Sequence, residues 1–291
     1  MSDLDFSQPI PPRPAAPPPP PPPPVYNAAM AMEFFKSAGT PEGFKQGQTI
    51  FAEDEKGGLF KRARMYVLIL GEVNMVAQNK VIGSVRPGDV FGEMAVIAGA
   101  ARTATAVAKS DCTVIGLDDK QYLSALQQKP EFAIMLMSIM NNRLRSTIQR
   151  LRASGALHAG TATESAVFDK KLLAGLARLM QGQEPMRYEQ GKMIMQEGTA
   201  GALMYIVLEG RVAITIKGGL VGRAGPGGVF GEMALVDQSP RAATAVAESD
   251  CTLLAINRPT FLQLVKTSPA FGAALLAGLA NRAAEMAARN K

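Results

Sequence analysis

Two segments of the chain carry the same combination of glycine, glutamate and arginine at the same spacing. Residues 91–107 read FGEMAVIAGAARTATAV, and residues 230–246 read FGEMALVDQSPRAATAV. The matched positions are offset by 139 (230 − 91) throughout. A packed core requires only apolar residues at such positions. Charged residues kept at one spacing in both copies therefore indicate a pair of ligand sites.

The residue types in these segments suit an anionic ligand that also carries hydroxyl groups. They are Gly92, Glu93 and Arg102 in the first copy and Gly231, Glu232 and Arg241 in the second. The glycine permits a tight backbone turn, and the free N–H groups of the short helix expected after it favour an anion. The arginine can form paired hydrogen bonds to a phosphate. The glutamate can accept hydrogen bonds from a hydroxyl pair, as on a ribose.

A second interpretation of the same spacing is a structural ion pair between the glutamate and the arginine within a turn. The spacing alone does not separate the two interpretations. We favour the ligand site because a structural pair has no need of Gly-Glu at a helix start and Arg-x-Ala-Thr on the next strand in both halves. The predicted ligand-binding residues are Gly92, Glu93, Met94, Ala95, Arg102, Thr103 and Ala104, and Gly231, Glu232, Met233, Ala234, Arg241, Ala242 and Ala243.

Two copies of a β-rich unit are expected to position these segments. Each half begins with a helical stretch, continues with short strands broken by turn residues, and ends in helices. The strand pattern is typical of a small β-barrel or jelly roll. The helices are expected at 28–37, 118–128 and 131–152, and at 166–181, 259–266 and 269–290. We predict a mainly β fold with flanking helices, with a first domain at 28–152, a linker at 153–165 and a second domain at 166–291.

Residues 1–27 are predicted to be a disordered, proline-rich tail. Pro17 to Pro24 is an unbroken proline run, which settles into a polyproline II helix because it lacks backbone donors. Such a run can serve as a stiff spacer or as a ligand for an aromatic-lined groove.

Composition excludes several classes of protein. The 291 residues suffice for about two domains. No apolar run approaches the roughly 18 residues of a membrane span, and no signal peptide is visible, so we expect a cytoplasmic protein without a transmembrane segment. The formal net charge of +6 is spread over short clusters, which favours solvated faces over a nucleic-acid patch.

The sequence contains no group of residues that predicts metal binding or catalysis. The single histidine, His158, falls in the linker, and no Cys/His cluster predicts a metal site. Cys112 and Cys251 occupy equivalent positions of the two halves, so we expect buried thiols rather than a disulfide. No nucleophile–base pair is present, and we therefore expect neither an enzyme nor a prosthetic group.

At this level of detail the repeated segment resembles the phosphate-binding cassette of cyclic nucleotide-binding domains. Phe-Gly-Glu-Met-Ala-Leu followed by Pro-Arg-Ala-Ala-Thr is similar to regulatory subunits of cyclic AMP-dependent protein kinase and to bacterial regulators of the catabolite activator family. Glu209-Gly210-Arg211-Val212 and Gly191-Lys192-Met193-Ile194 match the family's early strands. The resemblance covers roughly residues 28–152 and 166–291. It implies eight-stranded β-barrels that bind cyclic AMP or cyclic GMP as a regulatory ligand.

The resemblance also implies a role for each polar residue. Glu93 and Glu232 would hold the ribose 2′-hydroxyl, the two arginines the cyclic phosphate, and the two glycines the phosphate turn. The copies differ next to the arginine, where Thr103 resembles cyclic GMP-preferring sites and Ala242 resembles cyclic AMP sites. The first copy also has Ala101 where the family usually has proline.

These expectations combine into a non-catalytic cyclic nucleotide sensor that signals to an unidentified protein partner. The output would pass through the helices or the proline-rich tail, with lid candidates at 135–151 and 261–276. DNA binding is not expected, because the sequence ends at the helix after which the catabolite activator family adds a helix-turn-helix. The kinase-inhibiting motif of the regulatory subunits is also missing from the first 27 residues. The alternative is a scaffold protein, anchored by its tail, whose cassettes are kept for shape.

Overall fold

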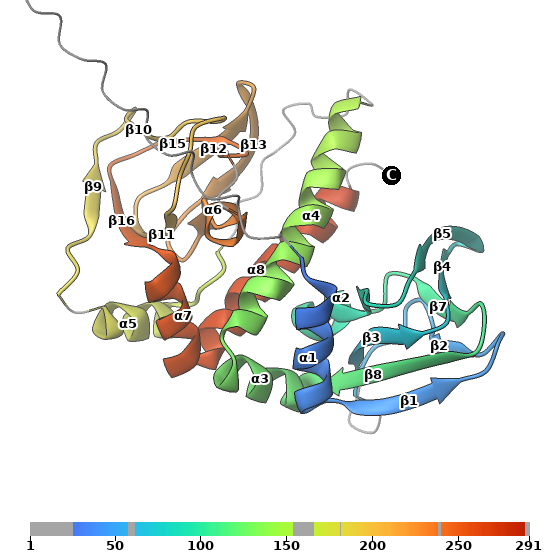
Figure 1. Cartoon of the computed structure of the whole chain (residues 1–291). Helices are drawn as coiled ribbons and strands as arrows, with labels where there is room; N and C mark the ends of the chain where they lie inside the picture. Colours follow the sequence, from blue (N-terminus) through green and yellow to red (C-terminus); the bar gives the residue numbers. More distant parts are fainter. Residues whose placement is uncertain (1–25, 58–61, 154–165, 181, 238–239, 289–291) are drawn as a thin grey trace, which may run out of the picture.

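The chain folds as two copies of one β-rich unit, each followed by helices, which confirms the predicted fold class (Figure 1). The computed structural model describes residues 26–57, 62–153, 166–180, 182–237 and 240–288. The predicted tail up to residue 25 and most of the predicted linker, 154–165, lie outside these residues. The domain boundaries therefore stay a prediction.

The first domain contains two antiparallel four-stranded sheets that enclose an apolar core. One sheet has the strand order β1-β8-β3-β6 and the other β2-β7-β4-β5. Tyr66 and Leu68 of one sheet pack with Phe51 and Ala106 of the other. The strands are β1 (Thr40–Phe44), β2 (Thr49–Phe51), β3 (Arg64–Leu70), β4 (Val73–Ala77), β5 (Lys80–Val85), β6 (Val90–Phe91), β7 (Thr105–Ala108) and β8 (Cys112–Asp118).

The second domain repeats this arrangement with the strand orders β14-β11-β16-β9 and β10-β15-β12-β13. Tyr205 and Val207 face Ala245 and Ala247 across its core. The strands are β9 (Met186–Tyr188), β10 (Met193–Met195), β11 (Met204–Glu209), β12 (Val212–Ile216), β13 (Gly219–Ala224), β14 (Val229–Phe230), β15 (Thr244–Ala247) and β16 (Cys251–Ile256). The expected eight strands are thus present in each domain.

Side-chain caps set where several helices begin. The Asp118 carboxylate accepts a hydrogen bond from the Gln121 amide in a capping box. Asp169 caps α5 through the Leu172 amide, so this helix starts four residues after the predicted residue 166. The helices are α1 (Ala28–Ala38), α2 (Glu93–Ala98), α3 (Asp119–Gln128), α4 (Glu131–Ala153), α5 (Lys170–Leu179), α6 (Met233–Asp237), α7 (Arg258–Thr267) and α8 (Pro269–Ala288).

The long helices α4 and α8 pack against each other between the two β units (Figure 1). Helix α4, which closes the first domain, also contacts α6 of the second, and α8 of the second domain contacts α2 of the first. Met137 and Met140 of α4 belong to the same buried cluster as Leu275 and Leu276 of α8. The two domains therefore share one hydrophobic core built around this helix pair.

No single described helix is long and apolar enough to cross a membrane, although α7 and the first part of α8, bent by 115°, pass that test together. The apolar side chains of this pair, including Phe261, Phe271 and Leu275, are buried in the core of the protein. Cys112 and Cys251 are free and buried, as predicted.

The tight turn between β3 and β4 depends on glycine at position 71. Gly71 has φ = 94°, and an added Cβ would overlap the Asp111 carbonyl oxygen and the Cys112 Sγ. We expect Gly71→Ala to lower the free energy of unfolding by about 2–3 kcal/mol, because strain and overlap add. Gly83 of β5 has open space around it, so Gly83→Ala is the matched control. Chemical denaturation that gives equal values for both variants would contradict this account.

Candidate ligand site

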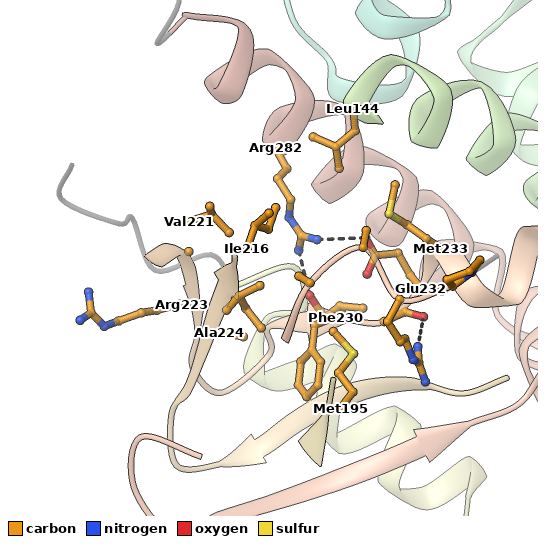
Figure 2. A pocket seen from close by; sticks show the side chains of 18 of the residues that line it. Leu144, Met195, Ile216, Val221, Arg223, Ala224, Phe230, Glu232, Met233 and Arg282 are labelled. Atoms are coloured by element: carbon orange, nitrogen blue, oxygen red, sulfur yellow. Dashed lines mark hydrogen bonds and ion pairs between the residues drawn. The ribbon is translucent and has the colours of Figure 1, made fainter. Parts of the chain in front are cut away.

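The repeated segment lines a pocket in each domain. All seven residues predicted for the first copy line the pocket of the first domain. Six of the seven predicted for the second copy line the other pocket (Figure 2). The seventh, Ala234, lies in α6 and its side chain is outside the described residues. The structure therefore brings the predicted residues together, while their role in binding stays a prediction.

A left-handed glycine opens each cassette helix. Gly92 has φ = 70° and Gly231 has φ = 75°, a region that side chains other than glycine rarely adopt. A Cβ on Gly92 would lie 2.8 Å from Nη1 of Arg102 and 2.9 Å from the Phe51 ring. Glycine is thus needed both for the turn and for the close approach of the arginine.

The two cassette arginines are buried and held by backbone carbonyls. Arg102 donates from Nη1 to the Gly92 carbonyl and from Nη2 to the Arg64 carbonyl, both at 2.7 Å. Arg241 donates from Nη1 to the Gly231 carbonyl at 2.9 Å. A guanidinium has five N–H donors, so each arginine keeps donors for a ligand. Burial lowers the pKa of both arginines, and an anion in the pocket would oppose that shift.

The cassette glutamates are also buried, and they pair with arginines of the final helices. Glu93 is 0% exposed, and its Oε1 lies 2.8 Å from Nη2 of Arg143 in α4. Neither Glu93 oxygen accepts a hydrogen bond from the described residues. In the second domain Glu232 Oε1 accepts a hydrogen bond from Nη1 of Arg282 in α8 at 3.0 Å (Figure 2). The Arg282 Nη2 group donates to the Val229 carbonyl at 2.9 Å.

The alternative of an ion pair inside the cassette is wrong. Both glutamates pair with a final-helix arginine, and neither forms an ion pair with the arginine of its own cassette within the described residues. The cassette arginine is held by carbonyls instead. Both residues of the cassette therefore line the pocket without forming a direct ion pair with each other.

Arg143 and Arg282 are site residues that the sequence reasoning missed. They are offset by 139 (282 − 143), like the cassettes, and each follows an asparagine, Asn142 or Asn281. A repeated Asn-Arg pair at the cassette offset was therefore a signal for them. The helices on which they lie were predicted, but the pairing with a buried carboxylate depends on tertiary packing.

Tyr26, assigned to the tail from sequence, lines the pocket of the first domain. Its hydroxyl donates to the Gly88 carbonyl. Burial, with smaller contributions from Asp89 and Glu93, raises the pKa of Tyr26 to about 12. In the second domain the equivalent carbonyl, that of Gly227, accepts the backbone amides of residues 167 and 168 instead. The first pocket thus has a phenol with no counterpart among the described residues that line the second.

The two pockets also differ beside the arginine and in size. Thr103 lines the first pocket and Ala242 the second, as expected from their places in the cassettes. The first cavity measures about 470 Å³ and the second about 120 Å³. The second pocket is the more enclosed of the two.

Comparison with known proteins gives a consistent result. The family model for the cyclic nucleotide-binding domain matches residues 41–129 and 185–268. A similar curated protein, the cAMP-dependent protein kinase regulatory subunit of Eremothecium gossypii, is 26% identical over 226 residues. That alignment covers 76% of this chain but 43% of the relative, so the chain spans less than half of that protein's length.

Two solved structures illustrate the similarity. The regulatory domain of Toxoplasma gondii PKA with cAMP is 21% identical, with a TM-score of 0.29, and the match covers 84% of this chain and 88% of that one. The catabolite activator protein of Thermus thermophilus is 22% identical, with a TM-score of 0.40 and coverage of 55% and 71%. The two segments that match the family model make up more than half of the chain, and each contains one cassette. The chain therefore belongs to the cyclic nucleotide-binding domain family and carries the domain twice.

Proposed function

We propose that the protein is a non-catalytic sensor of cyclic AMP or cyclic GMP with one binding site in each domain. The observation that carries this proposal is a buried arginine and a buried glutamate that line one pocket, found in both domains. Both residues are charged and nearly inaccessible to water. A ligand that brings a phosphate and a hydroxyl to them matches both at once.

The geometry supports a defined orientation of the ligand. The cyclic phosphate would lie against the arginine and the amide groups at the start of the cassette helix. The ribose 2′-hydroxyl would donate a hydrogen bond to the glutamate of its pocket. In the first domain this residue is Glu93, which accepts no hydrogen bond from the described residues. The base would then extend toward the apolar side of the pocket, formed in the second domain by Ile214, Ile216 and Val221.

The output would pass through the final helices to a protein partner. Arg143 and Arg282 connect the buried glutamates to α4 and α8 through ion pairs. A ligand that contacts a glutamate would therefore alter the ion pair that holds the helix. Similarity to a kinase regulatory subunit supports a protein partner that this chain regulates. Recruitment through the proline-rich tail and a cytoplasmic location belong to the same proposal.

Charge reversal of the cassette arginines tests the two sites separately. We expect Arg102→Glu and Arg241→Glu each to weaken cyclic nucleotide binding at the altered site by about 2–5 kcal/mol, because the phosphate loses its buried partner. Calorimetric titration with cyclic AMP and cyclic GMP should therefore lose one of two sites in each variant. The sensor function is wrong if the unaltered protein shows no heat and no thermal shift at millimolar ligand.

Arg187→Glu is the control, because Arg187 lies exposed in β9 and carries the same change in charge. It should leave both sites intact. Thermal denaturation of each variant separates a lost contact from a lost fold.

The proposed hydrogen bond to Glu93 and Glu232 is tested with a ligand that lacks the 2′-hydroxyl. We expect 2′-deoxy cyclic AMP to bind roughly 10- to 100-fold more weakly than cyclic AMP, since a hydrogen bond to a charged acceptor is lost. In Glu93→Gln or Glu232→Gln the difference between the two ligands should shrink at the altered site. An unchanged difference in both variants would show that the hydroxyl contacts another group.

A further inference from the structure

The two cassette arginines differ in the aromatic ring that lies against the guanidinium group. In the first domain the guanidinium carbon of Arg102 lies over the Phe51 ring, 4.0 Å from its centroid. In the second domain the guanidinium carbon of Arg241 lies 5.9 Å from the centroid of the Tyr205 ring. An aromatic face attracts a cation within about 6 Å, and more strongly when water is excluded. Phe51 and Arg102 are 4% and 5% exposed, so their contact is both closer and shielded.

Phe51 and Met195 occupy the same place in the two repeats. Phe51 ends β2 and pairs with Ala106 of β7, whereas Met195 ends β10 and pairs with Ala245 of β15. The two alanines are offset by 139 (245 − 106), like the cassettes. Phe51 lines the first pocket and Met195 lines the second (Figure 2). A ring in one pocket is therefore replaced by a thioether in the other.

The main chain holds the two arginines alike, but the side chains are held differently. The Arg102 amide donates to the Glu55 carbonyl at 2.9 Å, and the Arg241 amide donates to the Thr199 carbonyl at 2.8 Å. Each guanidinium also donates to the carbonyl of its cassette glycine. The further bond from Nη2 of Arg102 to the Arg64 carbonyl has no counterpart at Arg241 among the described residues. The first guanidinium is thus the more restrained of the two.

The contact with Phe51 restrains Arg102 without using its hydrogen-bond donors. Attraction to a ring acts on the positive charge of the guanidinium and requires none of its N–H groups. Two of these groups donate to carbonyls, and the others remain for an anion. A long side chain that is already ordered also loses less conformational freedom when a ligand binds.

We propose that Phe51 is a positioning residue, which holds the Arg102 guanidinium ready for a phosphate in the first pocket. This inference rests on the proposed function. Phe51 is itself fixed, because its ring stacks with those of Tyr66 and Phe91 at centroid distances of 6.2 and 6.1 Å. Without the ring, the guanidinium would take up more orientations, and binding would have to restrict them. The second site, with Met195 at this place, has the less restrained arginine.

NMR relaxation of the arginine Nε–H groups tests the restraint without any ligand. In the unaltered protein we expect an order parameter for Arg102 in the rigid range, about 0.85. In Phe51→Met it should fall toward the flexible range, below about 0.6, because the ring is lost. Arg241 serves as the internal reference and should not change.

Cyclic AMP titrations test whether the restraint matters for binding. In the Arg241→Glu background, where the first site reports, Phe51→Met should weaken binding roughly 3- to 30-fold, the range of a shielded cation–π contact. In the Arg102→Glu background, where the second site reports, the same change should alter affinity less than about twofold.

Phe44→Met is the matched control, because Phe44 packs against the same core cluster as Phe51 and lines neither pocket. It makes the same substitution in the same β unit. It should leave the Arg102 order parameter and both affinities unchanged. Thermal denaturation of both variants shows whether they lose similar stability.

The outcomes separate this inference from the sensor function. Phe51 does not position Arg102 if Phe51→Met leaves the order parameter or the first affinity unchanged, or if Phe44→Met weakens the first site equally. The sensor function stands in each of these cases. If the unaltered protein binds neither cyclic AMP nor cyclic GMP, the sensor function fails, and the role of Phe51 toward a phosphate fails with it. The order parameters then still decide whether Phe51 restrains Arg102.

Discussion

A carboxylate enclosed in a protein interior has to be compensated by a cation or by hydrogen bonds. The described part of this chain encloses two, Glu93 and Glu232, at the start of its cassette helices. In both domains the compensating cation is an arginine of the final helix. The pocket and the helix therefore cannot be positioned independently. The cassette needs the helix to neutralise its charge, and the helix is held where its arginine reaches the carboxylate.

The same two helices join the domains to each other. Helices α4 and α8 pack side by side and share a buried cluster that draws on both β units. Each also contacts the cassette helix of the opposite domain. Under the proposed function, a change at either cassette would be transmitted to a helix of the common core, since close-packed interiors rearrange as units rather than residue by residue.

Much of the fold and of the cassette could be predicted from the sequence, because local rules act there. Repetition at a fixed offset predicts two copies of one domain, and Gly-Glu followed by arginine predicts which side chains line one pocket. Helix starts were less accurate where a cap competes with apolar periodicity, as at Asp169. Tyr26 was assigned to the tail because it follows the proline run, and no local pattern indicates its contact with the Gly88 carbonyl.

Contacts between domains could not be predicted in this way. The sequence range 135–151 was named as a lid candidate, and Leu144, which lines the pocket of the second domain, lies within it. Nothing in the local pattern indicates that this leucine faces the pocket of the other domain. The arginines on Glu93 and Glu232 also need the packed helices before their partners can be identified. These contacts join residues about 50 or more positions apart (143 − 93, 216 − 144), which neither periodicity nor capping relates.

Because Arg143 and Leu144 are adjacent, an insertion or deletion earlier in α4 would affect both pockets at once. One residue inserted earlier in α4 would turn both side chains by about 100° and move them by about 1.5 Å. Both pockets would then lose a wall in a single event. Insertions and deletions should therefore be excluded from the first three turns of α4.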